Sequence, residues 1–155
     1  MTLQVTAMKR PFAPTGRLAP DLARVEACWR SLLRGSAQIP FWDDFDPTVL
    51  PDLAGRLFLM GVYPGPDRFR FDQVGAEITA AGRREVEGLF ADEMPPATPF
   101  EFLIAQCAAT VEAGEPTLYR HEPAKGRGYS RLILPMWGDG RIGMLLGVID
   151  WSGLG

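Results

Sequence analysis

The first hydrophobic pattern along the chain has helical spacing. Between Asp21 and Arg34, apolar residues recur every three or four positions, which places them on one face of an α-helix. We therefore predict an amphipathic helix over 21–34, with Asp21 capping its start and Gly35 following its end. Its apolar stripe is free to pack on the rest of the chain or on a second copy.

A second helical pattern starts at Thr98 and stops at Gly114. Thr98 and Glu101 have the spacing of a capping box, Pro99 suits the first turn, and Gly114 suits the end. The pattern predicts a helix from Thr98 onward with one buried stripe. That stripe consists of Phe100, Leu103, Ile104, Cys107, Ala108 and Val111.

Alternating apolar and polar residues predict β-strands elsewhere in the chain. In one of these strands, Phe69 and Phe71 face one side while Arg70 and Asp72 face the other. A Gly-Asp-Gly sequence at 138–140 predicts a hairpin turn. The expected strands are a pair within 55–75, then 117–122, 129–137 and 141–151.

Two connecting segments predict short helices. Asp46 precedes Pro47, a pair that suits a helix start because proline needs no N–H partner there. The segment 75–90 is expected to form one or two short helices. The resulting order is a helix, two strands, short helices, a longer helix and three strands, which indicates an α+β fold.

The composition is that of a single globular domain. At 155 residues with 46% hydrophobic content, the chain has enough apolar material for one core. We expect a flexible N-terminal tail over 1–20 and a single domain over 21–155 that includes the first helix. The net charge of −3 argues against a general nucleic-acid binder, which would ordinarily be basic.

The sequence carries no membrane or export signal. The longest apolar runs, such as 142–149, are far shorter than the roughly 20 residues that span a bilayer. Residues 1–20 lack the apolar core and cleavage site of a signal peptide. Cys28 and Cys107 are far apart and suit buried free thiols in a reducing compartment. These features favour a cytoplasmic protein.

Motifs for phosphate binding, metal binding or catalysis are absent from the sequence. The glycines of 75–88 match neither the dinucleotide nor the phosphate-loop spacing. The single histidine, His121, and two distant cysteines give no zinc-ligand pair. His121 is best read as a strand residue beside Glu122 that faces solvent or is loosely paired. The alternative is a small α+β enzyme in which His121 works with an acid such as Asp150.

Several short motifs follow one another in an informative order. They are Trp29 with Leu32 and Leu33, Pro40 through Pro47, Leu50 through Leu53, Phe69-Arg-Phe with Val74-Gly75, Gly82 through Gly88, Leu134-Pro135 and the Gly-Asp-Gly turn. In this order they resemble the PAS domain superfamily, and more narrowly a group of short stand-alone PAS-like proteins of alphaproteobacteria. The resemblance covers roughly Val25 to Trp151. It implies a PAS-like five-stranded antiparallel sheet with helices on one face, preceded by the N-terminal amphipathic helix.

The resemblance also implies a sensory or signalling module and not an enzyme. PAS domains commonly dimerise through an N-terminal helix and commonly bind a small molecule between sheet and helices. The flavin-binding sequence Asn-Cys-Arg-Phe is absent, and no histidine lies where haem-binding relatives place one. The cofactor is therefore unknown, with no flavin or haem signature.

Two sets of residues form candidate sites under this interpretation. A pocket for a small apolar metabolite would be lined by Phe71, Ile78, Phe90, Phe100, Ile104 and Leu134. A homodimer would use Val25, Trp29, Leu32 and Leu33 of the first helix. No catalytic or metal-binding residue is expected. The alternative is a protein-interaction adaptor with a filled core, in which the pocket residues are ordinary core and a downstream signalling protein is the partner.

Overall fold

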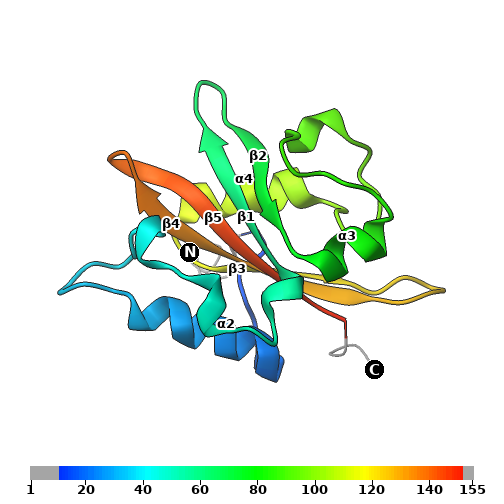
Figure 1. Ribbon diagram of the computed structural model, residues 1–155, viewed down its shortest axis with the longest axis horizontal. Helices are drawn as coiled ribbons and strands as arrows, with labels where there is room; N and C mark the ends of the chain where they lie inside the picture. Colours follow the sequence, from blue (N-terminus) through cyan, green and yellow to red (C-terminus); the bar gives the residue numbers. More distant parts are fainter. Residues whose placement is uncertain (1–10, 152–155) are drawn as a thin grey trace, which may run out of the picture.

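The computed structural model describes residues 11–151, which form a five-stranded antiparallel sheet between two helical layers (Figure 1). The strands are β1 (Leu57–Tyr63), β2 (Arg68–Val74), β3 (Thr117–His121), β4 (Tyr129–Gly138) and β5 (Arg141–Asp150), and the α-helices are α2 (Pro20–Ser31), α3 (Ala76–Gly82) and α4 (Leu103–Ala113). The strand order is β2-β1-β5-β4-β3. The predicted α+β class and antiparallel sheet are confirmed, and the order is consistent with a PAS-like arrangement.

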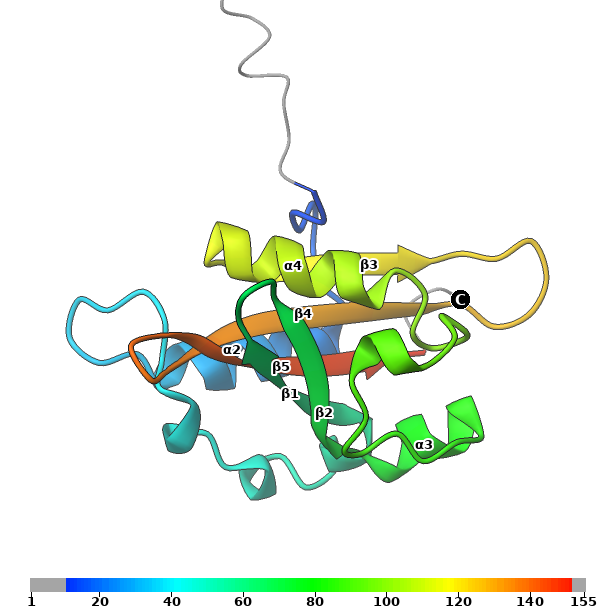
Figure 2. The same cartoon turned by 90° about the horizontal axis from the view of Figure 1, so that it is seen from above.

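Buried apolar side chains cover both sides of the sheet. The view from above shows α4 lying along β3 and β4 (Figure 2). We call the side toward α3 and α4 the inner face and the side toward α2 the outer face. On β1, Phe58 and Met60 point to the inner face, while Leu57 and Leu59 point to the outer face. Residues 129–136 of β4 are all buried, because both faces of this strand are covered.

Helix α2 lies on the outer face with its apolar stripe buried. The indole Nε1 of Trp29 donates a hydrogen bond to the backbone oxygen of Pro135 at 2.8 Å. The helix begins at Pro20, because proline suits the first position, and the predicted cap at Asp21 is therefore wrong. It ends at Ser31, before the predicted end of the 21–34 segment.

Helix α4 begins later than its sequence predicts. The hydroxyl of Thr98 does hydrogen-bond the carboxylate of Glu101, yet the first helical residue is Leu103. Phe102, just before it, has a φ of 57°, a left-handed conformation that interrupts a helix. The predicted start at Thr98 is therefore wrong, and residues 98–102 form turns instead.

One predicted short helix and one predicted hairpin turn are confirmed. Asp46 accepts a hydrogen bond from the backbone N–H of Thr48 at 3.0 Å and starts a short 3₁₀ helix with Pro47. Asp139 and Gly140 connect β4 to β5, and both have positive φ, as a type I′ turn requires. This hairpin turn fixes the register in which β4 and β5 pair.

The predicted flexible tail over 1–20 lies partly outside the described residues. Within the described part, the backbone oxygen of Phe12 accepts a hydrogen bond from the N–H of Leu118 at 2.7 Å. The Phe12 ring also lies 6.2 Å from the ring of Tyr119. Phe12, within the predicted tail, therefore packs against β3.

Candidate functional site

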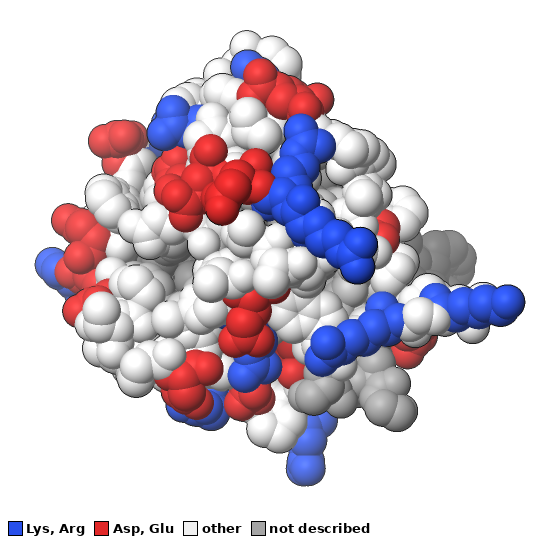
Figure 3. Space-filling model, turned by 45° about the vertical axis from the view of Figure 1, so that its right-hand side comes forward, with Lys and Arg blue, Asp and Glu red and all other residues white. Residues whose placement is uncertain are grey.

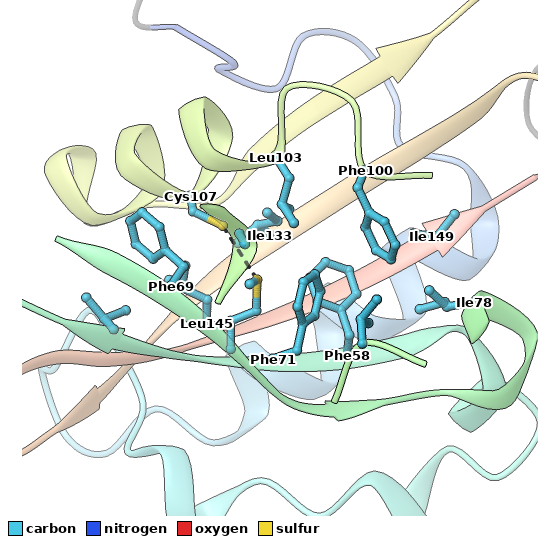
Figure 4. Close-up of a cluster of buried hydrophobic side chains, with 14 of the residues drawn as sticks. Phe58, Phe69, Phe71, Ile78, Phe100, Leu103, Cys107, Ile133, Leu145 and Ile149 are labelled. Carbon is cyan, nitrogen blue, oxygen red and sulfur yellow. Dashed lines mark hydrogen bonds between the residues drawn. The ribbon is translucent and has the colours of Figure 1, made fainter. Parts of the chain in front are cut away.

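Aromatic and aliphatic side chains lie between the inner face and helices α3 and α4 (Figure 4). The ring of Phe71 lies 6.3 Å from that of Phe58 and 5.2 Å from that of Phe100, measured between centroids. Cys107 of α4 approaches Met60 of β1, with their sulfur atoms 3.7 Å apart. Each of these five side chains is at most 6% exposed. The layer in which the resemblance places a ligand is thus occupied by the chain itself.

The two cysteines are free, as the sequence predicts. Burial raises the pKa of the Cys107 thiol to about 12 and also raises the pKa of Cys28. Neither side chain is therefore a thiolate near neutral pH, which is the form that attacks substrates or binds metals.

Three of the predicted pocket residues belong to this core, and a fourth lies at the sheet edge. Phe71, Ile78 and Phe100 belong to it and are buried. Phe90 lies at the sheet edge beside β2, half-buried, with its ring 5.3 Å from that of Tyr63. These contacts are packing contacts of the kind found throughout protein interiors.

The other two predicted pocket residues point elsewhere. Ile104 is 45% exposed, because the buried side of α4 includes Leu103, Gln106 and Cys107. The prediction counted only apolar residues, so it missed the buried Gln106 and misplaced the stripe. Leu134 lies on the outer face, beneath α2. Assigning Ile104 and Leu134 to one inner pocket is therefore wrong.

The residues predicted for a dimer interface are divided between core and surface. Val25 and Trp29 are at most 2% exposed, because α2 packs on the chain's own sheet. Leu32 and Leu33 follow the end of the helix and are half-buried. In this conformation, Val25 and Trp29 are closed to a partner, and the surface that remains is the end of α2.

A buried arginine links β4 to the turn before α4. The guanidinium of Arg131 donates to the backbone oxygens of Pro99 at 2.9 Å and Glu101 at 2.7 Å, and to Oε1 of Gln106 at 2.7 Å. Its carbon also lies 4.9 Å from the centre of the Tyr119 ring. Burial lowers the pKa of Arg131, and the surrounding acceptors offset the cost of burying its charge.

Gln106 and two threonines continue this network. The amide Nε2 of Gln106 donates to the backbone oxygen of Arg131 at 3.0 Å and to the hydroxyl of Thr117 at 3.1 Å. The hydroxyl of Thr110 donates to the backbone oxygen of Gln106 at 2.9 Å and lies 2.7 Å from that of Thr117. Polar atoms from α4, β3 and β4 thus bond one another in the interior.

Glu101 and His121 form the partly exposed end of the network. The carboxylate of Glu101 accepts hydrogen bonds from Tyr129, at 2.6 Å, and from Thr98, and it lies 3.5 Å from Nε2 of His121. The other ring nitrogen of His121 is 2.9 Å from the hydroxyl of Tyr119. Burial alone raises the pKa of Glu101, but the hydrogen bonds from Thr98 and Tyr129 bring it below its ordinary value. Glu101 is therefore ionised near neutral pH.

His121 and Asp150 lie on opposite faces of the sheet. The ring of His121 stacks on Tyr129 on the inner side, with centroids 5.1 Å apart. Asp150 is buried on the outer side, with Oδ1 3.5 Å from the guanidinium of Arg56. The predicted pairing of His121 with Asp150 is therefore wrong, because the sheet separates the two groups. His121 is half-buried and paired with Glu101 instead.

Sequence reasoning overlooked Arg131 and Gln106. The sequence does contain a signal for a buried network, namely polar residues inside apolar runs. Gln106 and Thr110 lie four residues apart on α4, and Arg131 interrupts a hydrophobic strand. Such residues mark buried networks, since buried polar groups need hydrogen-bond partners. Their partners, however, are far away in the sequence.

Comparisons with known proteins found no match to a family model, to a curated protein or to a solved structure. Within residues 11–151, no three His, Cys, Asp or Glu side chains are grouped to hold a metal ion, and no helix could cross a membrane. The face drawn in Figure 3 carries acidic and basic side chains interspersed. Function must therefore be argued from the geometry of the chain.

Proposed function

We propose that this protein is a PAS-like signalling module that acts through protein contacts and has a filled core. The observation that supports this most strongly is the inner layer, which Phe58, Phe71 and Phe100 occupy. Ligand pockets generally measure about 300 to 1,000 Å³, and these side chains would have to move to open one. Of the two alternatives left by the sequence, the adaptor therefore fits better than the sensor of an apolar metabolite.

The polar network supports a non-catalytic role. A catalytic acid or base must reach a proton on a substrate. Glu101 and His121 instead face each other, and each bonds a tyrosine of the same sheet. Arg131 is committed to the turn before α4. We infer that these groups hold β3, β4 and α4 together.

We further propose that the module is a cytoplasmic homodimer that contacts a downstream signalling protein. Leu32 and Leu33 are the part of the predicted interface that is not fully buried within the chain. Leu33→Glu is expected to shift the protein toward monomer in analytical ultracentrifugation. Ala27→Glu, at an exposed position of α2, is the control and should leave the assembly unchanged. If Leu33→Glu and Ala27→Glu had the same oligomeric state, Leu33 would not be part of the interface.

Native mass spectrometry of protein purified from its own host tests the filled core. The expected masses are whole multiples of the 17.1 kDa chain, with no molecule retained. A panel of apolar metabolites is expected to leave the melting temperature unchanged, because no space is open to them between the layers. A retained molecule that shows NMR contacts to Phe71 or Phe100 would contradict the proposal.

A further inference from the structure

The outer face carries a groove at the end of the sheet where β1, β2 and β5 meet. Its volume is about 330 Å³. Trp42 and Tyr63 are among its lining residues, with 46% and 40% of their surfaces exposed. We call this hollow the outer groove. Its lining is Trp42, Leu59, Gly61, Val62, Tyr63, Asp72, Gln73, Gly138, Asp139, Arg141, Gly143 and Met144.

Glycines allow the larger side chains to lie close to the sheet in the outer groove. A Cβ atom at Gly138 would come 2.6 Å from Cδ1 of Trp42. A Cβ atom at Gly61 would come 3.1 Å from both the carboxylate of Asp72 and the ring of Tyr63. These distances are shorter than ordinary van der Waals contacts. Side chains at these glycines would displace the groups that line the groove.

Both register shifts in the sheet pairing also lie at the outer groove. In the β1–β2 pair, Leu59 is opposite Gln73 and Met60 is opposite Phe71, so Asp72 is an extra residue. In the β4–β5 pair, a second shift leaves Gly143 as the extra residue. Bulges of this kind re-aim side chains and are common next to binding sites. One bulge places the carboxylate of Asp72 at the outer groove, and the other places Gly143 there, which has no side chain.

One arginine of the chain already occupies a position beside the outer groove and indicates which ligand groups would bind there. The guanidinium of Arg70 lies 3.1 Å from the carboxylate of Asp72 and 5.7 Å from the centre of the Tyr63 ring. A flat cation with N–H donors thus contacts both the acid and an aromatic face. Asp139 and Arg141 also line the groove, and the guanidinium of Arg141 donates to the backbone oxygen of Val62 at 2.9 Å.

We propose that the outer groove binds a small organic cation, an amidinium or guanidinium group on an apolar body. The cation pairs with Asp72 in place of Arg70, and the apolar body lies against Trp42 and Tyr63 over the glycines. Arg70 competes for the same carboxylate. Since its side chain is 41% exposed, it can turn into water when a ligand arrives.

Benzamidinium is the probe, and neutral benzamide is its matched control. Titration followed by ¹H–¹⁵N NMR is expected to shift the amides of Gly61, Gly138 and Gly143 and the indole N–H of Trp42. Benzamide should bind about tenfold more weakly or not at all, because it lacks the charge that strengthens a hydrogen bond to a carboxylate. Equal binding of the two compounds, or shifts confined to other residues, would overturn the proposal.

Two pairs of variants test the roles of Asp72 and Arg70. Asp72→Asn should weaken benzamidinium about tenfold, while Asp67→Asn, the same charge change in the exposed hairpin turn, should not. Arg70→Gln should tighten binding severalfold by removing the competitor. Arg68→Gln on the same strand, where the arginine pairs with Asp92 instead, should leave it unchanged.

Equal effects of the two aspartate variants, or no gain from Arg70→Gln, would count against the outer groove. Binding at the outer groove needs no space in the inner core, so the two proposals can fail separately. A retained molecule with NMR contacts to Phe71 or Phe100 would contradict the filled core alone, and benzamidinium shifts confined to residues away from the outer groove would contradict the outer groove alone.

Discussion

The inner and outer faces of the sheet are both apolar, yet they are covered in different ways. Side chains of α3, α4 and the turn before α4 fill the inner face, and Arg131 is buried at its β3–β4 end. Helix α2 covers the outer face only in part, so that the outer groove remains at the β1–β2 end. The difference indicates that the inner layer holds the fold together while the outer layer offers surface for recognition.

The arginines of the two faces show the same contrast. Arg131 is fully buried and bonds two backbone oxygens and Gln106. Arg70 is half-buried and pairs with one carboxylate at the surface. A buried charge loses its partners only at great cost, whereas an exposed ion pair contributes little.

The largest expected effect comes from breaking the inner network. Arg131→Met leaves the backbone oxygens of Pro99 and Glu101 without their donor, and each buried acceptor left unpaired costs about 1 to 3 kcal/mol, so the free energy of unfolding should fall by about 2 to 6 kcal/mol. Urea denaturation measures it. Arg70→Met, the same change on the outer face, should cost less than about 1 kcal/mol. Equal losses would mean that the two faces do not differ as described.

Neighbouring residues of α4 sharpen the contrast between core and surface. Leu103→Ala should lower the free energy of unfolding by about 2 to 5 kcal/mol, because Leu103 is buried in the inner core. Ile104→Ala should change it by less than about 1 kcal/mol, since this side chain is half exposed. A large loss of unfolding free energy in Ile104→Ala would mean that this side chain belongs to the core, as the predicted pocket requires.

Tryptophans test the covered and open parts of the outer face. Trp29→Phe removes a buried hydrogen bond to Pro135 and should cost about 1 to 3 kcal/mol in thermal or urea unfolding. Trp42→Phe, at the open end, should cost less than about 1 kcal/mol, because Trp42 is half exposed. If Trp29→Phe proved neutral, α2 would not be held on this sheet as the structure shows.

The smallest expected effect is on acid stability. The folded pKa of Glu101 lies below its ordinary value of 4.5, so its carboxylate stabilises the fold above that pH. This contribution is lost as the pH falls through the folded pKa. Glu101→Gln should therefore reduce stability near neutral pH and flatten the loss of stability between neutral and acid pH. Glu112→Gln, at an exposed position of α4, is the control and should keep the profile of the native protein.

Strands and turns were predictable because their signals are local. The alternation of Phe69 and Phe71 with Arg70 gave the correct faces of β2. Asp139 and Gly140 gave the hairpin, since few residues accept positive φ. These signals depend on a few adjacent residues, so they can be interpreted without knowledge of the rest of the fold.

The faces of β4 and the start of α4 were not predictable in the same way. Residues 129–136 are buried on both sides, so no alternation tells which face Leu134 takes. The turn before α4 is bonded by Arg131, which lies about thirty residues further along the chain. A capping box at Thr98 is a local signal, and here the contacts from the sheet override it.

The filled inner core is tested most directly by adding benzene to protein with labelled isoleucine methyl groups. Apolar cavities of sufficient size bind benzene and stay dry. In the native protein, we expect no saturable NMR shift at Ile78, Ile133 or Ile149, all of which line the inner core. Phe71→Ala, which opens a cavity there, should bind benzene and serves as the positive control. Saturable shifts at these methyl groups in the native protein would contradict the filled core.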